Sequence, residues 1–277
     1  MHLRRSLPAL LLAASCGGGS GSETPSPAPP PEAPAADSPA TPPTPEPHEP
    51  RLDQALQGVV RADYAGARAL AEAVQQERPD SARAAFVLAL AYHKEKNYGA
   101  AEPHFERALA LGPTFEPFAP VHYFRAWCLY YLGKLDAAEA SFTRHLELAP
   151  DEADSHFGLG VIALDGGRLD EAERSLSKAR ELSQAELVAG NSGRRADVAK
   201  AHARLADVHL LRDDAEAARA ALESCVRMYP PHYTAWYKLH QVLLTLDDAA
   251  GAAAALEQHD RWKAQVRPGS AGLGGAR

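Results

Sequence analysis

Small residues recur at a regular spacing through most of this chain, each one following a short polar turn. Counting from one alanine to the next gives intervals of 34, 37, 34, 46 and 34 residues. The alanines are Ala67, Ala101, Ala138, Ala172, Ala218 and Ala252. A fixed period of this length is the signature of a repeat architecture. The pattern therefore predicts about six copies of one structural unit, with insertions of three and twelve residues in two of the intervals.

The residues around these alanines repeat in the same register. Four positions later the chain carries, in most copies, a large apolar residue, as in Phe105, Phe142, Leu176, Leu222 and Leu256, with Ala71 in the first copy. Twelve positions later four copies carry proline, at Pro79, Pro113, Pro150 and Pro230, whereas the other two carry Gln184 and Ala264. A small residue lets two helices approach closely, and a proline cannot continue a helix. Each copy is therefore predicted to be a pair of helices that ends near the proline.

Composition supports helices throughout, because alanine is abundant and β-branched residues are sparse in the body of the chain. Two segments, HYFRAWCLYYLGKLDAAEASFTRHLELAP and HFGLGVIALDGGRLDEAERSLSKARELS, resemble tetratricopeptide repeat (TPR) motifs nearly throughout. The resemblance implies an all-α fold, a right-handed TPR-like α-solenoid of about six helix-turn-helix repeats over residues 48–267. The expected repeats cover about 48–81, 82–115, 119–152, 153–186, 199–232 and 233–266.

The first sixteen residues are similar to a bacterial lipoprotein signal peptide. Arg4 and Arg5 precede a short apolar stretch, and Ala13-Ala14-Ser15 leads into Cys16, which such a signal would have lipidated. The usual leucine three residues before the cysteine is replaced by Ala13. Two alternatives stay open: an ordinary secretory leader cleaved at the same small residues, or an apolar start with no targeting role.

Residues 17–47 are rich in Gly, Ser and Pro and carry no Lys or Arg. A segment of this composition cannot bury enough apolar surface to order itself, so a disordered tether is predicted. The Gly-rich residues 268–277 are predicted to be a disordered tail. If Cys16 is lipidated, the tether would separate the solenoid from the membrane.

The TPR resemblance also implies which side chains line the concave groove formed by the first helices. The candidates for the partner-binding groove are Phe86, Leu90, Tyr123, Trp127, Tyr130, Phe157 and Tyr237, with Tyr131 beside Tyr130 as a further candidate. Residues 115–131 hold seven of the nineteen aromatic residues of the chain, among them Phe115, Phe118 and Phe124. Aromatic side chains concentrate binding energy at interfaces. This cluster is either a binding hot spot or part of the hydrophobic core.

The polar residues restrict the kind of ligand that the groove is expected to bind. The Lys, Arg and Asn side chains with which many TPR proteins clamp a C-terminal carboxylate are absent, since apolar residues such as Phe86, Leu90 and Trp127 stand at those positions. The opposite side of the groove is expected to carry Lys200, Arg204, Asp207 and Lys238. The insertion around residues 183–197 is interpreted as an excursion between repeats or as a second contact point.

No cofactor, metal or catalytic residue is predicted. His122, His156 and His202 occupy equivalent positions in three repeats, too far apart to share a zinc ion. Cys128 and Cys225 fall at small buried positions two repeats apart, which predicts free thiols. No phosphate loop or nucleophile elbow occurs, and a formal net charge of −7 does not favour nucleic acid.

These patterns predict a protein-protein interaction scaffold or assembly adaptor rather than an enzyme, with a protein or peptide as partner and a lipid anchor as the only membrane contact. The expected location is the bacterial cell envelope, on the outer membrane facing the periplasm, or secreted or periplasmic without the lipid. Similar lipoproteins help assemble secretins for type IV pili. Alternatives are an accessory subunit that recruits a cell-wall or polysaccharide enzyme, and a cytoplasmic scaffold if residues 1–16 are not a leader.

Overall fold

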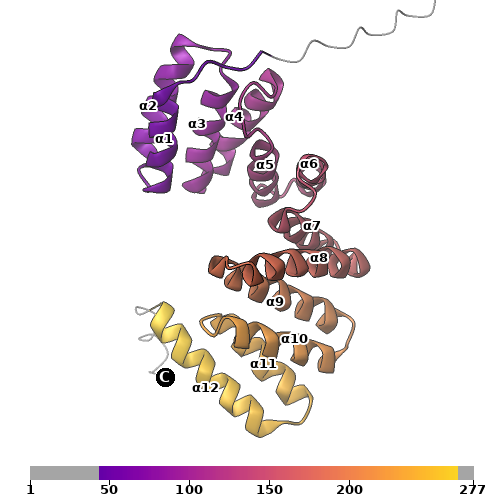
Figure 1. Cartoon of the computed structure of the whole chain (residues 1–277). Coiled ribbons are helices and arrows are strands. Elements are labelled where there is room, and N and C mark those ends of the chain that lie inside the picture. The colour runs from indigo at the N-terminus through magenta and orange to yellow at the C-terminus, as the bar shows by residue number, and fades with distance from the viewer. Residues whose placement is uncertain (1–43, 268–277) are drawn as a thin grey trace, which may run out of the picture. The chain divides into compact units, whose positions relative to one another are not determined.

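The computed structural model describes residues 44–267, and this part of the 277-residue chain contains twelve α-helices and no strand (Figure 1). The helices are α1 (Pro50–Val60), α2 (Tyr64–Glu77), α3 (Ala82–Lys94), α4 (Tyr98–Leu111), α5 (Pro120–Tyr131), α6 (Leu135–Leu148), α7 (Ala153–Asp165), α8 (Leu169–Val188), α9 (Arg195–Leu211), α10 (Ala215–Met228), α11 (Tyr233–Thr245) and α12 (Ala249–Val266). They form six consecutive hairpins, so the predicted all-α class and helical-repeat array are confirmed. The predicted signal peptide, Cys16 and the C-terminal tail lie outside the described residues.

The recurring alanines lie at the centre of each hairpin. All six are on the second helix of their pair, and each is at most 1% exposed. The large residues four positions later, Phe105, Phe142, Leu176 and Leu222, are fully buried beside them. In the last hairpin Leu256 is only half-buried, because no helix among the described residues follows α12 to cover it. The hydrophobic core is therefore built along the array from one hairpin to the next, as expected for a solenoid.

Proline sets the end of four of the six second helices. The residue just before Pro79, Pro150 and Pro230 is the C-cap of α2, α6 and α10, and Gly112 before Pro113 is the C-cap of α4. A proline disfavours helical geometry in the residue before it, so the helix stops there. Helix α8 carries Gln184 at the equivalent position and continues to Val188, which makes it 20 residues long.

The turn inside each hairpin follows one design. In every turn one residue adopts a left-handed conformation, with φ between 58° and 73°: Ala62, Lys96, Gly133, Gly167, Asp213 and Asp247. In four turns the side chain just before the second helix then caps it. Asp63, Asn97, Asp214 and Asp248 each accept a hydrogen bond from the amide three residues later, at 2.8–3.3 Å. The aspartate pairs in the last two turns are thus structural.

The insertion in the fourth interval, between Ala172 and Ala218, is mostly helical. The first residues of the insertion extend helix α8. A short 3-10 turn (Ser192–Arg194, η1) follows, and α9 starts at Arg195. Arg194 holds these elements together, because its guanidinium contacts Glu186 at 2.8 Å, Asp154 at 3.1 Å and Asp197 at 3.3 Å. The insertion therefore lengthens two packed helices instead of forming a separate loop.

Residues 44–49 lie along the first hairpins, although the sequence assigns 44–47 to the tether. The carboxylate of Glu46 accepts hydrogen bonds from Ser81 Oγ at 2.6 Å and from the Arg83 amide at 3.1 Å, and the Thr114 hydroxyl also donates to it. Arg78 donates to Glu49 at 2.9 Å. This segment is therefore joined to α3 and to the loop before α5.

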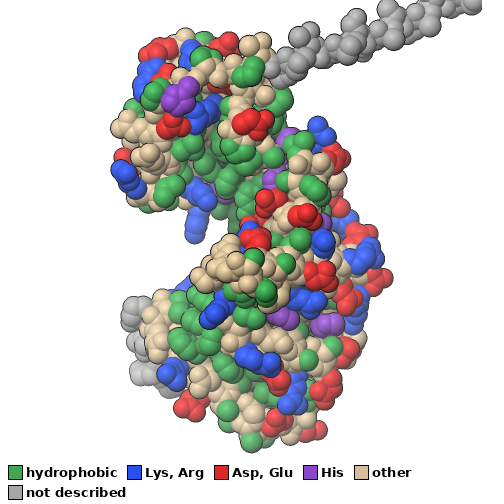
Figure 2. Space-filling view, in the orientation of Figure 1, with side chains coloured by type: hydrophobic (Ala, Val, Ile, Leu, Met, Phe, Trp, Pro, Cys, Tyr) green, Lys and Arg blue, Asp and Glu red, His purple; other side chains and the backbone are tan. Residues whose placement is uncertain are grey.

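Charged side chains of both signs are interspersed over the edge of the array where α6, α8 and α10 lie (Figure 2). Ion pairs connect neighbouring repeats there, such as Arg168 with Glu139 at 2.6 Å and Arg212 with Asp170 at 2.6 Å. Exposed pairs of this kind stabilise little. They indicate a solvated surface rather than a binding patch. No helix among the described residues combines the length and the apolar character needed to cross a membrane.

Candidate binding pocket

Helix α5 presents three aromatic side chains in a row. Tyr123, Trp127 and Tyr131 are four residues apart, so they lie on one face of the helix. Pro120 occupies the first turn, where a proline is favourable because its missing N–H has no helical partner there. The row continues as stacked rings, with 6.1 Å between the Trp127 and Tyr131 centroids and 4.6 Å between those of Tyr131 and Tyr98.

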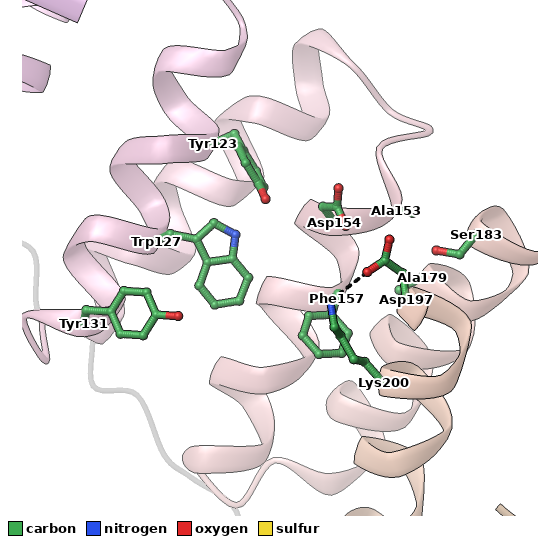
Figure 3. Close-up of a pocket in the computed structure, with 10 residues that line it drawn as sticks. All are labelled: Tyr123, Trp127, Tyr131, Ala153, Asp154, Phe157, Ala179, Ser183, Asp197 and Lys200. Carbon is green, nitrogen blue, oxygen red and sulfur yellow. Dashed lines mark hydrogen bonds and ion pairs between the residues drawn. The ribbon is translucent and has the colours of Figure 1, made fainter. Parts of the chain in front are cut away.

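These side chains form one wall of a pocket of about 310 Å³ (Figure 3). Asp154 and Phe157 from α7, and Asp197 and Lys200 from α9, lie opposite them, and the buried side chains of Ala153, Ala179 and Ser183 complete the lining. The Trp127 and Phe157 ring centroids are 6.5 Å apart. The pocket thus combines four helices from the third, fourth and fifth repeats, and the ends of the insertion contribute Ser183 and Asp197.

The polar side of the pocket is a small ion-pair network. Lys200 donates to Asp197 at 2.8 Å, and Arg194 joins Asp197 to Asp154. The acidic partners raise the pKa of Arg194 above its usual value. Burial raises the pKa of the Tyr123 hydroxyl, and the nearby Asp154 carboxylate raises it further, so this hydroxyl stays protonated. The pocket therefore offers aromatic faces next to fixed carboxylates.

The groove residues predicted from the sequence divide into three groups. Tyr123, Trp127, Phe157 and Tyr131 line the pocket. Phe86 and Leu90 are each 7% exposed and pack in the hydrophobic core, where the Phe86 ring lies 5.7 Å from that of Phe115. These two side chains have little surface left to offer to a partner, and the Phe86 ring is packed against Phe115 of the loop before α5 and Phe124 of α5.

The remaining two groove candidates lie outside the pocket. Tyr130 points to the next repeat, and its hydroxyl donates to Asp165 at 2.8 Å. Tyr237 on α11 is 44% exposed and packs beside His259, with 5.3 Å between the ring centroids. Of the seven aromatic residues in 115–131, Phe118 belongs to the hydrophobic core and Phe115 and Phe124 pack against it, so that stretch serves both packing and the pocket.

Asp154 and Asp197 are the charged pocket residues that the sequence does not predict in the groove. Each lies in the first turn of its helix, where a carboxylate is ordinary because it interacts favourably with the helix dipole. Lys200 was expected on the polar side of the groove and does line the pocket. The other expected polar residues form a separate group, in which Asp207 accepts from Lys238 and, at 3.3 Å, from Arg204.

The histidines and cysteines lie elsewhere. Burial lowers the pKa of His122 and His202 to about 4, and His156 contacts the Pro150 carbonyl oxygen at 3.0 Å. Residues 44–267 contain no group of three or more His, Cys, Asp or Glu side chains that could hold a metal ion. Cys128 and Cys225 are buried free thiols, as predicted, and burial raises the pKa of both to about 12.

Consecutive helical hairpins that share one continuous core, with a pocket between their first helices, define an α-helical repeat protein. A family model described as tetratricopeptide repeat matches residues 52–114, 125–186 and 203–265, which is more than half of the chain. The chain belongs to this family, whose members are generally non-catalytic scaffolds that bind protein or peptide partners. A search of curated proteins gives no match.

Several solved structures share the fold. The pilus biogenesis factor PilW is 20% identical with a TM-score of 0.63, over 80% of this chain and 94% of that chain. PilF of Pseudomonas aeruginosa is 17% identical with a TM-score of 0.62, over 80% and 92%. YrrB, described as having an unusual peptide-binding site, is 20% identical with a TM-score of 0.54, over 67% and 88%. Identities this low establish similarity of fold.

Proposed function

We propose that this protein is a non-catalytic scaffold that holds a segment of a partner protein, a peptide or a helix, on the surface formed by α5, α7 and α9. The observation that carries the proposal is the pocket, where Tyr123, Trp127, Tyr131 and Phe157 border open space instead of being closed in the core. Large aromatic side chains in such positions are the residues that dominate binding energy at protein interfaces.

We further propose that the scaffold works in the bacterial cell envelope, held to the outer membrane by lipid on Cys16 and facing the periplasm. The basis is the sequence of residues 1–16 and the proline-rich segment that follows. The fold shared with PilW, described as a type IV pilus biogenesis factor, supports a role in assembling an envelope machine. Recruitment of a cell-wall enzyme is the alternative, and the identity of the partner distinguishes the two.

The test is affinity capture followed by mass spectrometry, from detergent-solubilised cells. We expect the double variant Trp127→Ala/Tyr131→Ala to capture its partner at least about tenfold less well, because a hot-spot residue contributes on the order of 2 kcal/mol. The matched control is Leu148→Ala/Tyr229→Ala, which removes two exposed apolar side chains outside the pocket. Circular dichroism establishes that both variants are folded. Equal capture by the two folded variants would contradict a binding role for this pocket.

A further inference from the structure

The lining of the pocket carries more negative than positive charge. Two of its ten lining residues are acidic, Asp154 and Asp197, and one is basic, Lys200. The ion-pair network also includes Arg194 and Glu186, so the network as a whole has three acidic side chains and two basic ones. The side chain of Asp154 is 40% exposed and that of Asp197 is 27% exposed. Both carboxylates therefore retain surface for a further donor.

The aromatic wall, like the carboxylates, favours a positively charged ligand. The faces of tryptophan, tyrosine and phenylalanine rings carry negative potential, which attracts a cation within about 6 Å of the ring centre. Tyr123, Trp127, Tyr131 and Phe157 line the pocket together with the two carboxylates (Figure 3). A positive group between them would therefore interact favourably with the rings and with Asp154 and Asp197 at once.

Other ligand chemistries fit less well. A carboxylate or phosphate group would meet two like charges, and Lys200 is already paired with Asp197 at 2.8 Å. A purely apolar side chain would take Asp154 and Asp197 out of water without giving them a new donor, which is costly for charged groups. The volume of about 310 Å³ is at the lower end for ligand sites, so it suits one long side chain better than a larger ligand.

We propose that the pocket binds a lysine or arginine side chain of the partner segment. This inference rests on the proposed scaffold function and specifies the chemistry of its ligand. The aliphatic part of the basic side chain packs on Trp127 and Phe157, and its charged end reaches Asp154 and Asp197. Arginine and lysine both suit this arrangement, because each combines an apolar stem with a cationic end.

The experiment pans a random dodecapeptide display library against the purified full-length chain. We expect the enriched peptides to share one lysine or arginine position. A synthetic peptide with that residue is then compared with its norleucine counterpart by fluorescence anisotropy. We expect the basic peptide to bind at least about tenfold more tightly, since a charge-assisted contact commonly contributes that much.

Variants of the protein locate the effect. Asp154→Asn/Asp197→Asn should remove most of the difference between the two peptides, whereas Asp136→Asn/Asp151→Asn, with the same change in net charge outside the pocket, should preserve it. Because the first pair also contacts Arg194, a second variant acts in the opposite direction. Lys200→Glu, at an exposed side chain, should tighten binding of the basic peptide.

Three results would overturn the inference. Enriched peptides that share an apolar or acidic residue and no basic one would refute the ligand chemistry and leave the scaffold function standing. So would a basic peptide whose affinity is unchanged both in Asp154→Asn/Asp197→Asn and in Lys200→Glu. A library from which no sequence is enriched, together with a capture experiment that finds no partner, would refute this inference and the proposed function together.

Discussion

On helix α5, the position of a single residue decides whether its side chain lines the pocket. Tyr130 and Tyr131 are adjacent, and both were candidates for the groove. Only Tyr131 is eight residues from Tyr123 and four from Trp127, so it continues their face of the helix, while Tyr130 turns toward Asp165. Residue type alone does not distinguish the two tyrosines. The direction of the helix face, set by packing against α6 and α7, does.

Two glycines of α7 are required by close packing. A Cβ atom on Gly158 would lie 2.3 Å from Cζ of the buried Phe142, and one on Gly160 would lie 2.6 Å from Cγ of Leu176. These large residues stand four positions after the recurring alanines. The two glycines of α7 make room for them, Gly158 for Phe142 of α6 and Gly160 for Leu176 of α8. The glycines therefore belong to the core pattern of the repeat.

We predict that Gly158→Ala destabilises the protein by about 1–3 kcal/mol, because the added methyl group overpacks the core against Phe142. The control is Gly99→Ala in α4, where a Cβ atom meets nothing within 4 Å. That change should stabilise the protein by about 0.4–1 kcal/mol through lower entropy of the unfolded chain. Urea unfolding followed by circular dichroism measures both. A midpoint for Gly158→Ala at or above that of the wild type would refute the packing account.

At the scale of elements, the segment before α1 is joined to the first two helical hairpins and to the loop before α5. Glu46 accepts from Ser81 and Arg83 at the start of α3, and its backbone amide donates to the Thr114 carbonyl oxygen at 2.6 Å. Burial would raise the pKa of the Glu46 carboxyl group. The hydrogen bonds from Ser81, Thr114 and the amides of Ala82 and Arg83 outweigh it, so the pKa is lowered below the ordinary value of 4.5.

The lowered pKa gives a pH-dependent prediction. A carboxyl group with a depressed pKa in the folded state stabilises fully above its unfolded value, near 4.5, and loses this contribution as pH falls through the folded pKa. Glu46→Gln should therefore lower stability at pH 7 by about 1 kcal/mol, as a charge-assisted hydrogen bond becomes a neutral one. The difference should shrink as pH falls below 4.5.

Hydrogen exchange of the amides in α1 and at the start of α3, at pH 7 and at acidic pH, measures this effect. The control is Glu116→Gln, which removes the same charge from an exposed side chain on the loop before α5. Protection that is equal in the two variants at pH 7 would show that Glu46 does not hold this segment in place.

The ends of the helices could be predicted from particular residues, and the exceptions have a physical cause. Pro79, Pro113, Pro150 and Pro230 each stand two residues after the last residue of a helix. The insertion lacks such a residue, and its polar stretch Gly190–Arg195 suggests a loop. Instead, Arg194 pairs with three acidic side chains from α7, α8 and α9, so long-range ion pairs hold the extended helices together.

At the scale of the whole molecule, the pocket depends on the repeat array, whereas the proposed anchor depends on residues 1–16. These are separable, because the described helices lie in residues 50–266 and Cys16 lies outside the described part. A scaffold that binds through α5, α7 and α9 would bind its partner segment with or without lipid. What the anchor would add is a fixed location for that binding.

We predict that the protein fractionates with the membrane and that Cys16→Ser moves it to the soluble fraction, since a lipidated cysteine supplies the hydrophobic anchor. Labelled palmitate and intact-mass measurement of the protein purified from its own cells report the lipid directly. The control is Cys128→Ser, a buried thiol inside the third repeat. A native protein that carries Met1 or an unmodified Cys16 would refute the anchor and favour the cytoplasmic alternative.

What the sequence determined by itself is the repeated hairpin. Its marks, the small residue, the large residue four positions later and the proline at the end, act within a few dozen residues, so their effect can be read locally. Only the tertiary structure decided the pocket. Tyr123, Trp127, Asp154, Asp197 and Lys200 meet because three hairpins stack and an insertion extends two helices toward them. Such a contact is set by packing between repeats, which no local pattern specifies.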